Sequence, residues 1–445
     1  MATLLDDPAP TTHETGSRAL RTSLYAGVLL VAVAMAIPPL FDWNVRIESF
    51  PPLNAAWDPK VGQGTLPALL IAALATWRAA QVAAVLPWRQ LLLATWTTGV
   101  LWMVSLATIE GWKGIGGGLN GANEYLPTAR VTDDFAHTLK IFVSMIPDDA
   151  KPYHWPAHIA GHPPGALGFF VLLSRLGLGS TIAAGAVVTV LAATTAVAVL
   201  VTVRALGAEA LARRAAPFLV LGPAAIWQCA SGDAMFAAFA AWGLACLAIA
   251  ASRTRTGPAL CWSALAGLLL GATVMLSYGL LLMGLPALVV LFLARSWRPL
   301  VPTALAALAV VLAFAAYGFN WLAGYRDLHD RYWIGIAHQR SGWYWTWANL
   351  AVLVCSAGLI AAPALAAAWG RRRDSDPQVR TVALLCGAGI AMVLAADVSQ
   401  MSRAEVERIW LPFAPWLLLS CALLPDQWRR RGLVLQLGVA LVVQH

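Results

Sequence analysis

The stretch TIAAGAVVTVLAATTAVAVLVTV, residues 181–203, decides the fold class, because it contains no charged side chain from end to end. Apolar stretches of similar length recur along the whole chain, separated by polar interruptions. The candidate spans are 24–41, 66–84, 91–109, 181–203, 215–231, 234–251, 259–277, 279–294, 301–319, 348–368, 379–396, 409–424 and, as a short final candidate, 432–445. Since a helix crosses a bilayer with about 20 apolar residues, we expect an all-α, polytopic integral membrane protein with about 11–13 transmembrane helices.

The composition points to the same class of protein. Of the 445 residues, 59% are hydrophobic and only 12% are charged, and the mean hydropathy is +0.68. A soluble protein has about a quarter of its residues charged, so lipid must cover much of this surface. The net charge of +8 does not indicate nucleic acid as a partner, because the charges lie at the ends of apolar segments. The six cysteines lie inside apolar stretches without a CxxC motif, so we expect neither disulfides nor a zinc–thiolate site.

The charged residues are distributed unevenly over the turns between the spans. With a cytoplasmic N-terminus, one alternating topology collects basic residues on the inner side and most carboxylates on the outer side, as membrane proteins usually do. We therefore expect a multi-pass protein of the plasma membrane with an extracytoplasmic working site. The inner-side arginines are Arg18, Arg21, Arg89, Arg204, Arg213, Arg214, Arg253, Arg255, Arg295, Arg298, Arg371, Arg372, Arg373, Arg380, Arg429, Arg430 and Arg431.

The domain organisation predicted from this topology is simple. Residues 1–22 are polar and include three carboxylates, which is unlike a cleavable signal peptide, and we interpret them as a cytoplasmic N-terminal tail. Residues 23–445 are expected to form a single transmembrane domain with two long outer loops, 110–164 and 320–347.

The first outer loop is the longest interruption of apolar character. Within it, 127–146 (PTARVTDDFAHTLKIFVSMI) has apolar residues at helical spacing and is predicted to be an amphipathic helix. That helix would lie on the membrane surface or pack on the protein's own loops, and the sequence leaves both arrangements open. The next segment, 165–178, is too short to span and contains Arg175, so we interpret it as interfacial or re-entrant.

The second outer loop, 320–347 (NWLAGYRDLHDRYWIGIAHQRSGWYWTW), is rich in Trp, Tyr, Arg and His. Trp and Tyr favour the membrane interface, so the segment could be an aromatic belt. The alternative is the wall of a cavity for a sugar or a lipid headgroup, since aromatic rings stack on the apolar faces of sugars and Arg binds phosphate.

Two residues of the first outer loop are candidates for chemistry. Glu124 follows a glycine-rich approach, GIGGGLNGANEY, in which the backbone can come close to a ligand. A single loop carboxylate can equally be a solvated surface group. His162 precedes two prolines, Pro163 and Pro164, which restrict the backbone on both sides of their peptide bonds. This motif is either a stiff turn or a device that places an imidazole at the mouth of a cavity.

Later in the chain, charged residues lie at the outer ends of two apolar segments. Asp233 is either a helix N-cap or a carboxylate that binds the acceptor. Glu405, Glu407 and Arg408 fall within four residues and precede two prolines. They are either flanking charges or part of a site in which Arg408 binds a lipid phosphate bidentately.

A metal site is the weaker interpretation of the histidines. His154, His158 and His162 recur every four residues, which would place them on one face of a helix, as in some metal sites. However, Pro156 and Pro163 interrupt any regular helix there, and we assign no metal ligand.

These motifs together resemble the GT-C superfamily of membrane glycosyltransferases, which use polyprenyl-phosphate sugars. The chain looks closest to the branch with protein O-mannosyltransferases and the lipid A aminoarabinose transferase. In that branch the first large outer loop contains an acidic residue followed by Tyr and an Ala-Arg pair, which resemble Glu124-Tyr125 and Ala129-Arg130 here. A His-Pro-Pro motif follows, similar to His162-Pro163-Pro164.

The resemblance extends to about residues 90–425. A cytoplasmic arginine-rich turn and an outer aspartate follow in the family, similar to Arg213-Arg214 and Asp233. A late arginine before a proline-containing span resembles Arg408, which precedes Pro412 and Pro415.

Two departures from the family pattern affect the assignment of the catalytic base. Two apparent spans precede the one at 91–109, whereas the family usually has this loop after its first span. The acidic pair common at the catalytic position is reduced to Asn123-Glu124, which leaves Glu110 as a rival catalytic carboxylate.

The resemblance implies an inverting transfer of a sugar from a polyprenyl-phosphate donor to a glycan, lipid or protein acceptor outside the cytoplasm. A carboxylate, Glu124 or Glu110, would be the general base. Arg408, Arg130 or Lys140 would stabilise the leaving phosphate, with or without a divalent cation. The residues expected to bind substrate are His162, Tyr125, Arg130, Asp233, Glu405 and Arg408.

Two other classes of protein fit the same composition. One is a transporter or flippase for lipid-linked sugars, in which charges inside the spans would mark a substrate path. Few charges lie in mid-span here, Arg78 and Arg175 being the nearest cases, and no inverted repeat is evident. The other is a non-catalytic membrane protein of the cell envelope.

Overall fold

The computed structural model describes residues 12–47 and 51–445, and within these ranges every regular element is a helix. This confirms the predicted all-α class. The predicted N-terminal tail, 1–22, lies partly outside the described residues, and the first helix, α1, begins at Thr12.

In the described part of the chain, seven helices are long and apolar enough to cross a membrane. They are α1 (Thr12–Leu40), α2 (Thr65–Val85), α3 (Trp88–Ala107), α8 (Thr181–Ala205), α11 (Gly232–Ser252), α12 (Thr256–Leu276) and α19 (Pro377–Val398). Two helix pairs are bent spans, α14 (Leu300–Ala316) with α15 (Trp321–Ile334) at 76° and α17 (Gly342–Ala357) with α18 (Ala361–Gly370) at 98°. The described residues therefore have the architecture of a polytopic membrane protein with seven to nine candidate spans, fewer than the predicted 11–13.

Three further predicted spans are divided between short helices, and the fourth is part of a longer helix. The segment 215–231 is divided between α9 (Glu209–Val220) and α10 (Ala224–Gln228), and 279–294 between a 3-10 helix, η5 (Tyr278–Met283), and α13 (Gly284–Leu293). The segment 409–424 contains the end of α20 (Val406–Ile409), α21 (Ala414–Leu418) and η6 (Leu419–Leu423), and 432–445 is part of α22 (Asp426–Gln444).

The broken segment 409–424 lies in the protein core, unlike α14. The side chains of Leu417, Leu419 and Leu423 are buried, whereas Leu305 and Leu312 of α14 are more than half exposed. A leucine in a protein core and a leucine in lipid are equally apolar, so hydropathy cannot separate a core segment from a span.

The ends of broken helices inside the bundle have polar partners. Gln436 of α22 donates from Nε2 to the carbonyl oxygens of Phe218 in α9 and Ala357 in α17, at 3.3 and 3.1 Å. The indole of Trp102 donates to the carbonyl oxygen of Gly222 at 3.3 Å. Irregular backbone at membrane depth is tolerated where the protein itself supplies such partners.

The predicted amphipathic helix over 127–146 is wrong as a single element. The segment contains α4 (Tyr125–Val131), α5 (Phe135–Ile141) and a 3-10 turn, with a break at 132–134. Leu139 and Phe142 are buried, and the ring of Phe135 packs against Gly168 of α7 (Pro164–Arg175). These side chains therefore pack on the protein, which is the second of the two arrangements left open.

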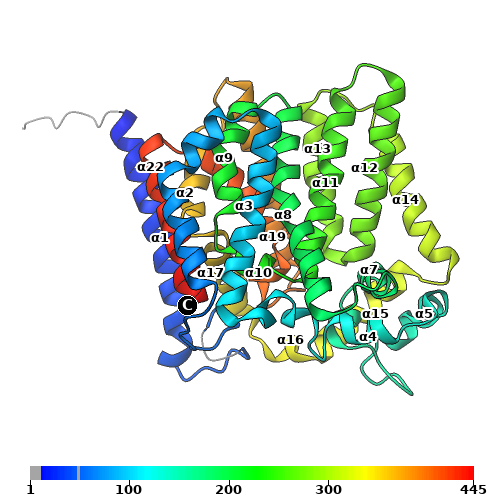
Figure 1. Cartoon of the computed structure of the whole chain (residues 1–445). Helices are drawn as coiled ribbons and strands as arrows, with labels where there is room; N and C mark the ends of the chain where they lie inside the picture. The colour runs from blue at the N-terminus through cyan, green and yellow to red at the C-terminus, as the bar shows by residue number, and fades with distance from the viewer. Residues whose placement is uncertain (1–11, 48–50) are drawn as a thin grey trace, which may run out of the picture.

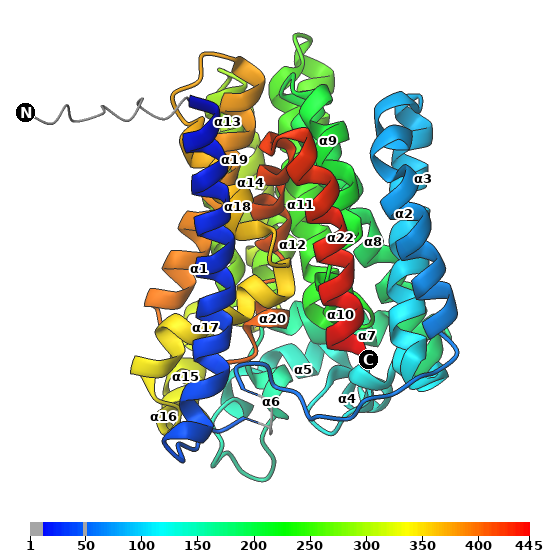
Figure 2. The ribbon, with the colours of Figure 1, turned by 90° about the vertical axis from the view of Figure 1, so that its left-hand side faces the viewer.

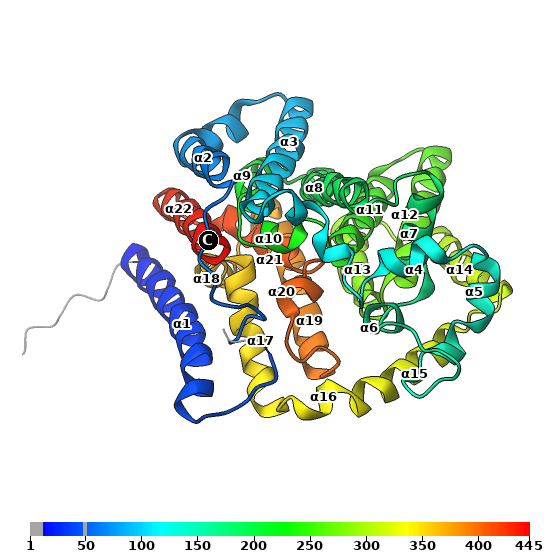
Figure 3. The same cartoon turned by 60° about the horizontal axis from the view of Figure 1, so that its bottom comes forward.

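Three helices lie across one end of the bundle. Figure 1 shows α7 almost end-on below the long helices, which agrees with the prediction that 165–178 does not span. Figure 3 shows α15 and α16 (Ile336–Gln339) running along the same end. Arg331 of α15 donates to the carbonyl oxygens of Ile146 and Trp155 at 2.7 and 2.9 Å, which ties the two long loops together.

The two ends of the bundle therefore differ in character, as Figures 1 and 2 show. We call the end formed by the loops 108–164 and 399–409 and by helix α15 the loop end. The opposite end, which we call the arginine-rich end, contains Arg213 in the first turns of α9, Arg371 directly after α18 and Arg429 in the first turn of α22. Arg213 there donates to the carbonyl oxygen of Leu86 at 2.8 Å.

Candidate functional site

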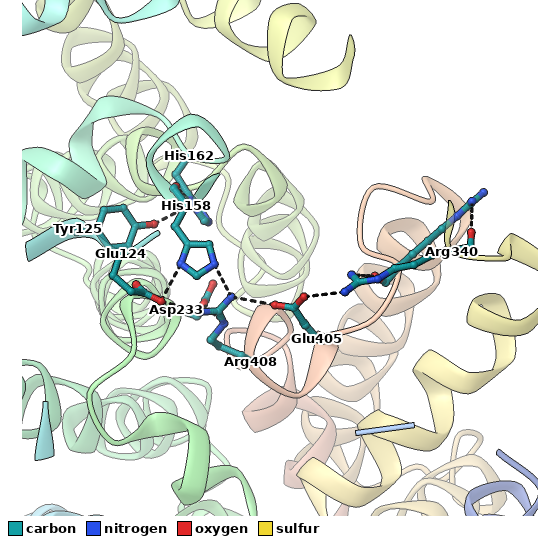
Figure 4. Close-up of polar contacts among 9 residues, drawn as sticks. Glu124, Tyr125, His158, His162, Asp233, Arg340, Glu405 and Arg408 are labelled. Atoms are coloured by element: carbon teal, nitrogen blue, oxygen red, sulfur yellow. Dashed lines mark hydrogen bonds and ion pairs between the residues drawn. The ribbon is translucent and has the colours of Figure 1, made fainter. Parts of the chain in front are cut away.

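Three segments that are far apart in the sequence meet at the loop end. Glu124 lies at the start of α4, His158 in the short helix α6 (Ala157–Ala160), and Arg408 in α20. Figure 4 shows their side chains pointing toward one another. The contact between Glu124 and Arg408 joins residues 284 positions apart.

The backbone around Glu124 directs its side chain into this cluster. Glu124 is in an extended conformation at the N-cap of α4, and its carboxylate makes no capping hydrogen bond to the helix. The backbone N–H of His158 donates to the carbonyl oxygen of Asn123 at 3.2 Å. Main chain and side chain therefore both hold α6 against the Glu124 segment.

Glu124, His158 and Arg408 form a closed triangle of polar contacts. Glu124 Oε1 is 2.8 Å from His158 Nδ1 and 3.4 Å from Arg408 Nη1, and His158 Nε2 is 3.3 Å from Arg408 Nη2. Arginine can only donate, so His158 Nε2 must accept and Nδ1 must carry the proton donated to Glu124. The contacts thus indicate a neutral imidazole in one tautomer between a carboxylate and a guanidinium.

Arg408 contacts two further carboxylates. Its Nε is 3.3 Å from Asp233 Oδ2, and its Nη2 is 3.5 Å from Glu405 Oε2. Burial lowers the pKa of Arg408, but the charges of Asp233, Glu124 and Glu405 together raise it above its ordinary value. The guanidinium therefore stays charged, and each of its nitrogens already contacts a polar partner.

Glu405 links this cluster to a second arginine. Arg340 Nη2 is 3.1 Å from Glu405 Oε1. Burial raises the pKa of Glu405, but Arg408 and Arg340 outweigh that effect and lower it below its ordinary value. With His158 neutral, the three carboxylates and the two arginines of the cluster sum to a charge of −1.

The loop that positions Glu405 has an unusual backbone held by a buried amide. Ala404 and Glu405 have φ values of 72° and 60°, a region that side chains other than glycine rarely adopt. Asn349 of α17 donates to Asp397 Oδ1 and to the Ser402 carbonyl oxygen, each at 2.9 Å, and accepts from the Ala404 N–H at 3.2 Å. Asn349 thereby fixes the loop that precedes Arg408.

Tyr125 and His162 extend the cluster away from Arg408. The Tyr125 hydroxyl is 2.8 Å from His162 Nδ1, and the same nitrogen is 2.7 Å from the His158 carbonyl oxygen. Burial lowers the pKa of His162 and raises that of Tyr125 well above its ordinary value, so both are neutral at pH 7. His162 is therefore linked to Glu124 indirectly, through its contacts with Tyr125 and His158.

Glu407, next to Arg408, points away from these contacts into the protein. Only 5% of the residue is exposed, and Oε2 has no hydrogen-bond partner among the described residues. Burial raises the pKa of Glu407 to about 7.

Two of the predicted site residues lie outside these contacts. Glu110 is 45% exposed at its side chain and pairs with Lys60 at 3.3 Å. Arg130 donates to Asn120 Oδ1, to the Gly179 carbonyl oxygen and to Thr181 Oγ1, so it holds loops together. The structure brings the other six together: Glu124, Tyr125, His162, Asp233, Glu405 and Arg408.

The N-cap interpretation of Asp233 is wrong. The side chain of Ser231 accepts from the Ala234 N–H at 3.2 Å and caps α11. Asp233 lies in the first turn, where its carboxylate is free to contact Arg408.

Sequence reasoning missed three residues of this site. His158 appeared only in the four-residue histidine spacing, as part of a metal-site alternative. Arg340 was one basic residue within an aromatic-rich loop, and Asn349 was one amide in an apolar stretch; nothing in the sequence marks either. Among the described residues, no group of three His, Cys, Asp or Glu side chains has an arrangement that could hold a metal ion.

The arrangement can orient and deprotonate a polar ligand. It offers a carboxylate, an imidazole and a partly buried guanidinium within hydrogen-bond distance of one another. No protein-family model, no curated protein and no solved structure matches the chain.

Proposed function

We propose that this protein is an inverting glycosyltransferase that moves a sugar from a polyprenyl-phosphate donor to an acceptor hydroxyl at the loop end. The observation that supports this proposal most is the contact of Glu124 with His158 and Arg408. A carboxylate that receives charged and neutral donors in a buried position is oriented before substrate arrives, which favours catalysis.

In the proposed reaction Glu124 is the general base. It accepts the proton of the acceptor hydroxyl as that oxygen forms a bond to the anomeric carbon. The bond from the anomeric carbon to the phosphate oxygen breaks, and its electron pair leaves with the lipid phosphate. Inversion at the anomeric carbon follows from attack opposite to the leaving group.

In the proposed reaction, Arg408 pairs with the carboxylates and does not bind the lipid phosphate. Its nitrogens contact Glu124, Asp233 and Glu405, and the cluster has a net negative charge. A phosphate there would displace a carboxylate and meet repulsion from the other two. We propose that Arg408 positions Glu124, and that Asp233 and Glu405 bind sugar hydroxyls.

The proposed localisation follows the charge distribution. The arginine-rich end would face the cytoplasm under the rule for basic turns, and the loop end would face outward from the plasma membrane. The lipid tail of the donor would lie in the bilayer beside the bundle, with its phosphate at the interface. The partners would be a lipid-linked sugar, a glycan, lipid or protein acceptor, and the bilayer.

The test is transfer of labelled sugar from polyprenyl-phosphate donors by the purified protein in liposomes. Glu124→Gln should lower the rate about 10²–10⁴-fold, as expected for loss of a general base. Glu110→Gln is the matched control, since Glu110 pairs with Lys60 and not with Arg408. Wild-type transfer by a folded Glu124→Gln variant would reject the assignment, and loss of transfer only in Glu110→Gln would move it to Glu110.

The same liposomes separate the other two classes of protein. A flippase would move the labelled donor across the bilayer without forming a glycosylated product. A non-catalytic envelope protein would do neither. Both results contradict the transferase proposal.

A further inference from the structure

The arginine-rich end contains a group of guanidiniums that the proposed reaction does not use. Arg214 lies in α9, Arg371 directly after α18 and Arg429 in α22. Figure 2 shows this end at the top, opposite to the loop end. Burial lowers the pKa of Arg214, and the charges of Arg429 and Arg371 lower it further. Arg214 and Arg429 both donate to Asp426 Oδ1, so their guanidiniums lie side by side, and the charge of Arg371 also acts on Arg214.

The acceptors of this cluster are fewer than its donors. One oxygen, Asp426 Oδ1, accepts from Arg214 Nη2 at 3.1 Å and also from Arg429. The Nε groups of Arg214 and Arg429 are buried without a hydrogen-bond partner among the described residues. Charged donors that are buried without an acceptor are costly. An anion that approached these side chains would therefore stabilise the cluster.

The local carboxylates do not neutralise the charge. Arg371 pairs with Asp374 at 2.7 Å within its own turn. The side chain of Asp426 is 83% exposed, so water screens its attraction for the arginines. The neighbouring positions add further positive charge, namely Arg372, Arg373, Arg430 and Arg431.

The position of the cluster determines which anion can reach it. The turn that contains Arg371 leads directly into α19, a candidate span that begins at Pro377. The guanidiniums therefore lie near the level at which a bilayer presents its headgroups. Guanidiniums bind phosphate oxygens in a planar, two-bond geometry, and basic pockets between helices bind anionic headgroups.

We infer that Arg214, Arg371 and Arg429 form a binding site for the phosphate of an anionic phospholipid headgroup. The site is at the opposite end of the bundle from Glu124 and is independent of the proposed transferase activity. The lipid phosphate would accept hydrogen bonds from at least two of the three side chains.

The test measures lipid retention by the full-length protein with native mass spectrometry. Phosphatidylglycerol and phosphatidylcholine with the same acyl chains are titrated separately. Wild-type protein should retain one phosphatidylglycerol at concentrations at which phosphatidylcholine is lost. Arg214→Gln with Arg371→Gln should weaken phosphatidylglycerol binding at least about tenfold, since one charge-assisted hydrogen bond corresponds to about tenfold in affinity.

The matched control is Arg253→Gln with Arg255→Gln. It removes the same charge from exposed side chains in the turn between α11 and α12, at the same end. The control should keep wild-type binding. Equal weakening in both double variants would show a general effect of positive charge and overturn the site, and so would no weakening in either.

Three further measurements decide the result if the Arg214 variant does not fold. Arg371→Gln alone breaks only the ion pair with Asp374 in the same turn. This variant should weaken phosphatidylglycerol binding about tenfold. Wild-type protein that does not prefer phosphatidylglycerol to phosphatidylcholine would overturn the inference without any variant. Displacement of the lipid by inorganic phosphate at equal concentration would identify a free anion as the ligand and overturn the lipid assignment.

Discussion

The loop end and the arginine-rich end both contain ion pairs, but the pairs differ in burial. At the loop end, Arg408 meets Glu124 from 284 positions away, and both side chains are mostly buried. At the arginine-rich end, Arg371 pairs with Asp374 three residues away, and the distant pair of Arg214 with Asp426 has a carboxylate that is 83% exposed. The two ends therefore differ most in how far their paired carboxylates are removed from water.

This difference has an energetic consequence. Charges removed from water lose solvation that their mutual attraction only partly returns, so a buried network is not by itself a source of stability. Loss of one partner from such a network is strongly destabilising, because the others remain buried and unpaired. Exposed pairs contribute little. A group of charged side chains that is buried in spite of the lost solvation is therefore a candidate for function.

The largest expected effect is that of Arg408→Leu. It leaves Glu124, Asp233 and Glu405 facing one another without their common partner, and we expect a loss of about 3–5 kcal/mol in the free energy of unfolding. Chemical unfolding in detergent measures it. Arg253→Leu, an exposed arginine at the other end, should change stability by less than about 0.5 kcal/mol. A similar small change in both variants would contradict the difference between the ends.

An intermediate effect is expected from pH, through Glu407. Its folded-state pKa of about 7 lies above the ordinary value of 4.5, so the folded protein binds the proton more tightly than the unfolded chain. The contribution to stability is full below about pH 4.5 and is lost as pH rises through about 7, by roughly 3 kcal/mol. Unfolding measured between pH 5 and 8 should show this decline.

Glu407→Gln is the control for that pH dependence. The amide keeps the shape of the side chain but does not titrate, so the decline between pH 5 and 8 should become smaller. The charges of Glu405 and Arg408 also act on Glu407. Both keep their charge over this range, because the pKa of Glu405 is lowered and that of Arg408 is raised. An unchanged decline in Glu407→Gln would assign the pH dependence to another group.

The smallest effect is expected at the arginine-rich end. Glu209 pairs with Arg204 and Arg213 at 2.8 and 2.7 Å, but its side chain is 35% exposed. Glu209→Gln should therefore change the free energy of unfolding by less than about 1 kcal/mol. Asp233→Asn, which removes a carboxylate that is only 11% exposed and contacts Arg408, should cost more. The reverse order would show that burial does not distinguish the two ends.

Part of the site was predictable from residue type and placement. Glu124, Asp233 and Arg408 are charged residues next to apolar segments, and one topology places them on the same side of the membrane. His158 was not chosen, since its role depends on the contact with Glu124 at 2.8 Å. Glu110 was a reasonable rival by sequence, but it points to Lys60.

The membrane-spanning helices, too, could be predicted only in part. The span prediction was correct for 181–203, where a long apolar run forms one continuous helix, α8. It was wrong for 215–231, which is broken between α9 and α10 at 221–223, where Pro223 lacks the N–H that a continuing helix needs. Most of its side chains are covered by other helices.

The sequence by itself determined that this protein is an all-α membrane protein with arginines concentrated in the turns of one end, because hydropathy and charge are properties of local composition. Only the tertiary structure decided which apolar segments are core and which face lipid, and which charged side chains share one site. The physical reason is that core and lipid are alike in polarity, while an ion pair depends on the packing of distant segments.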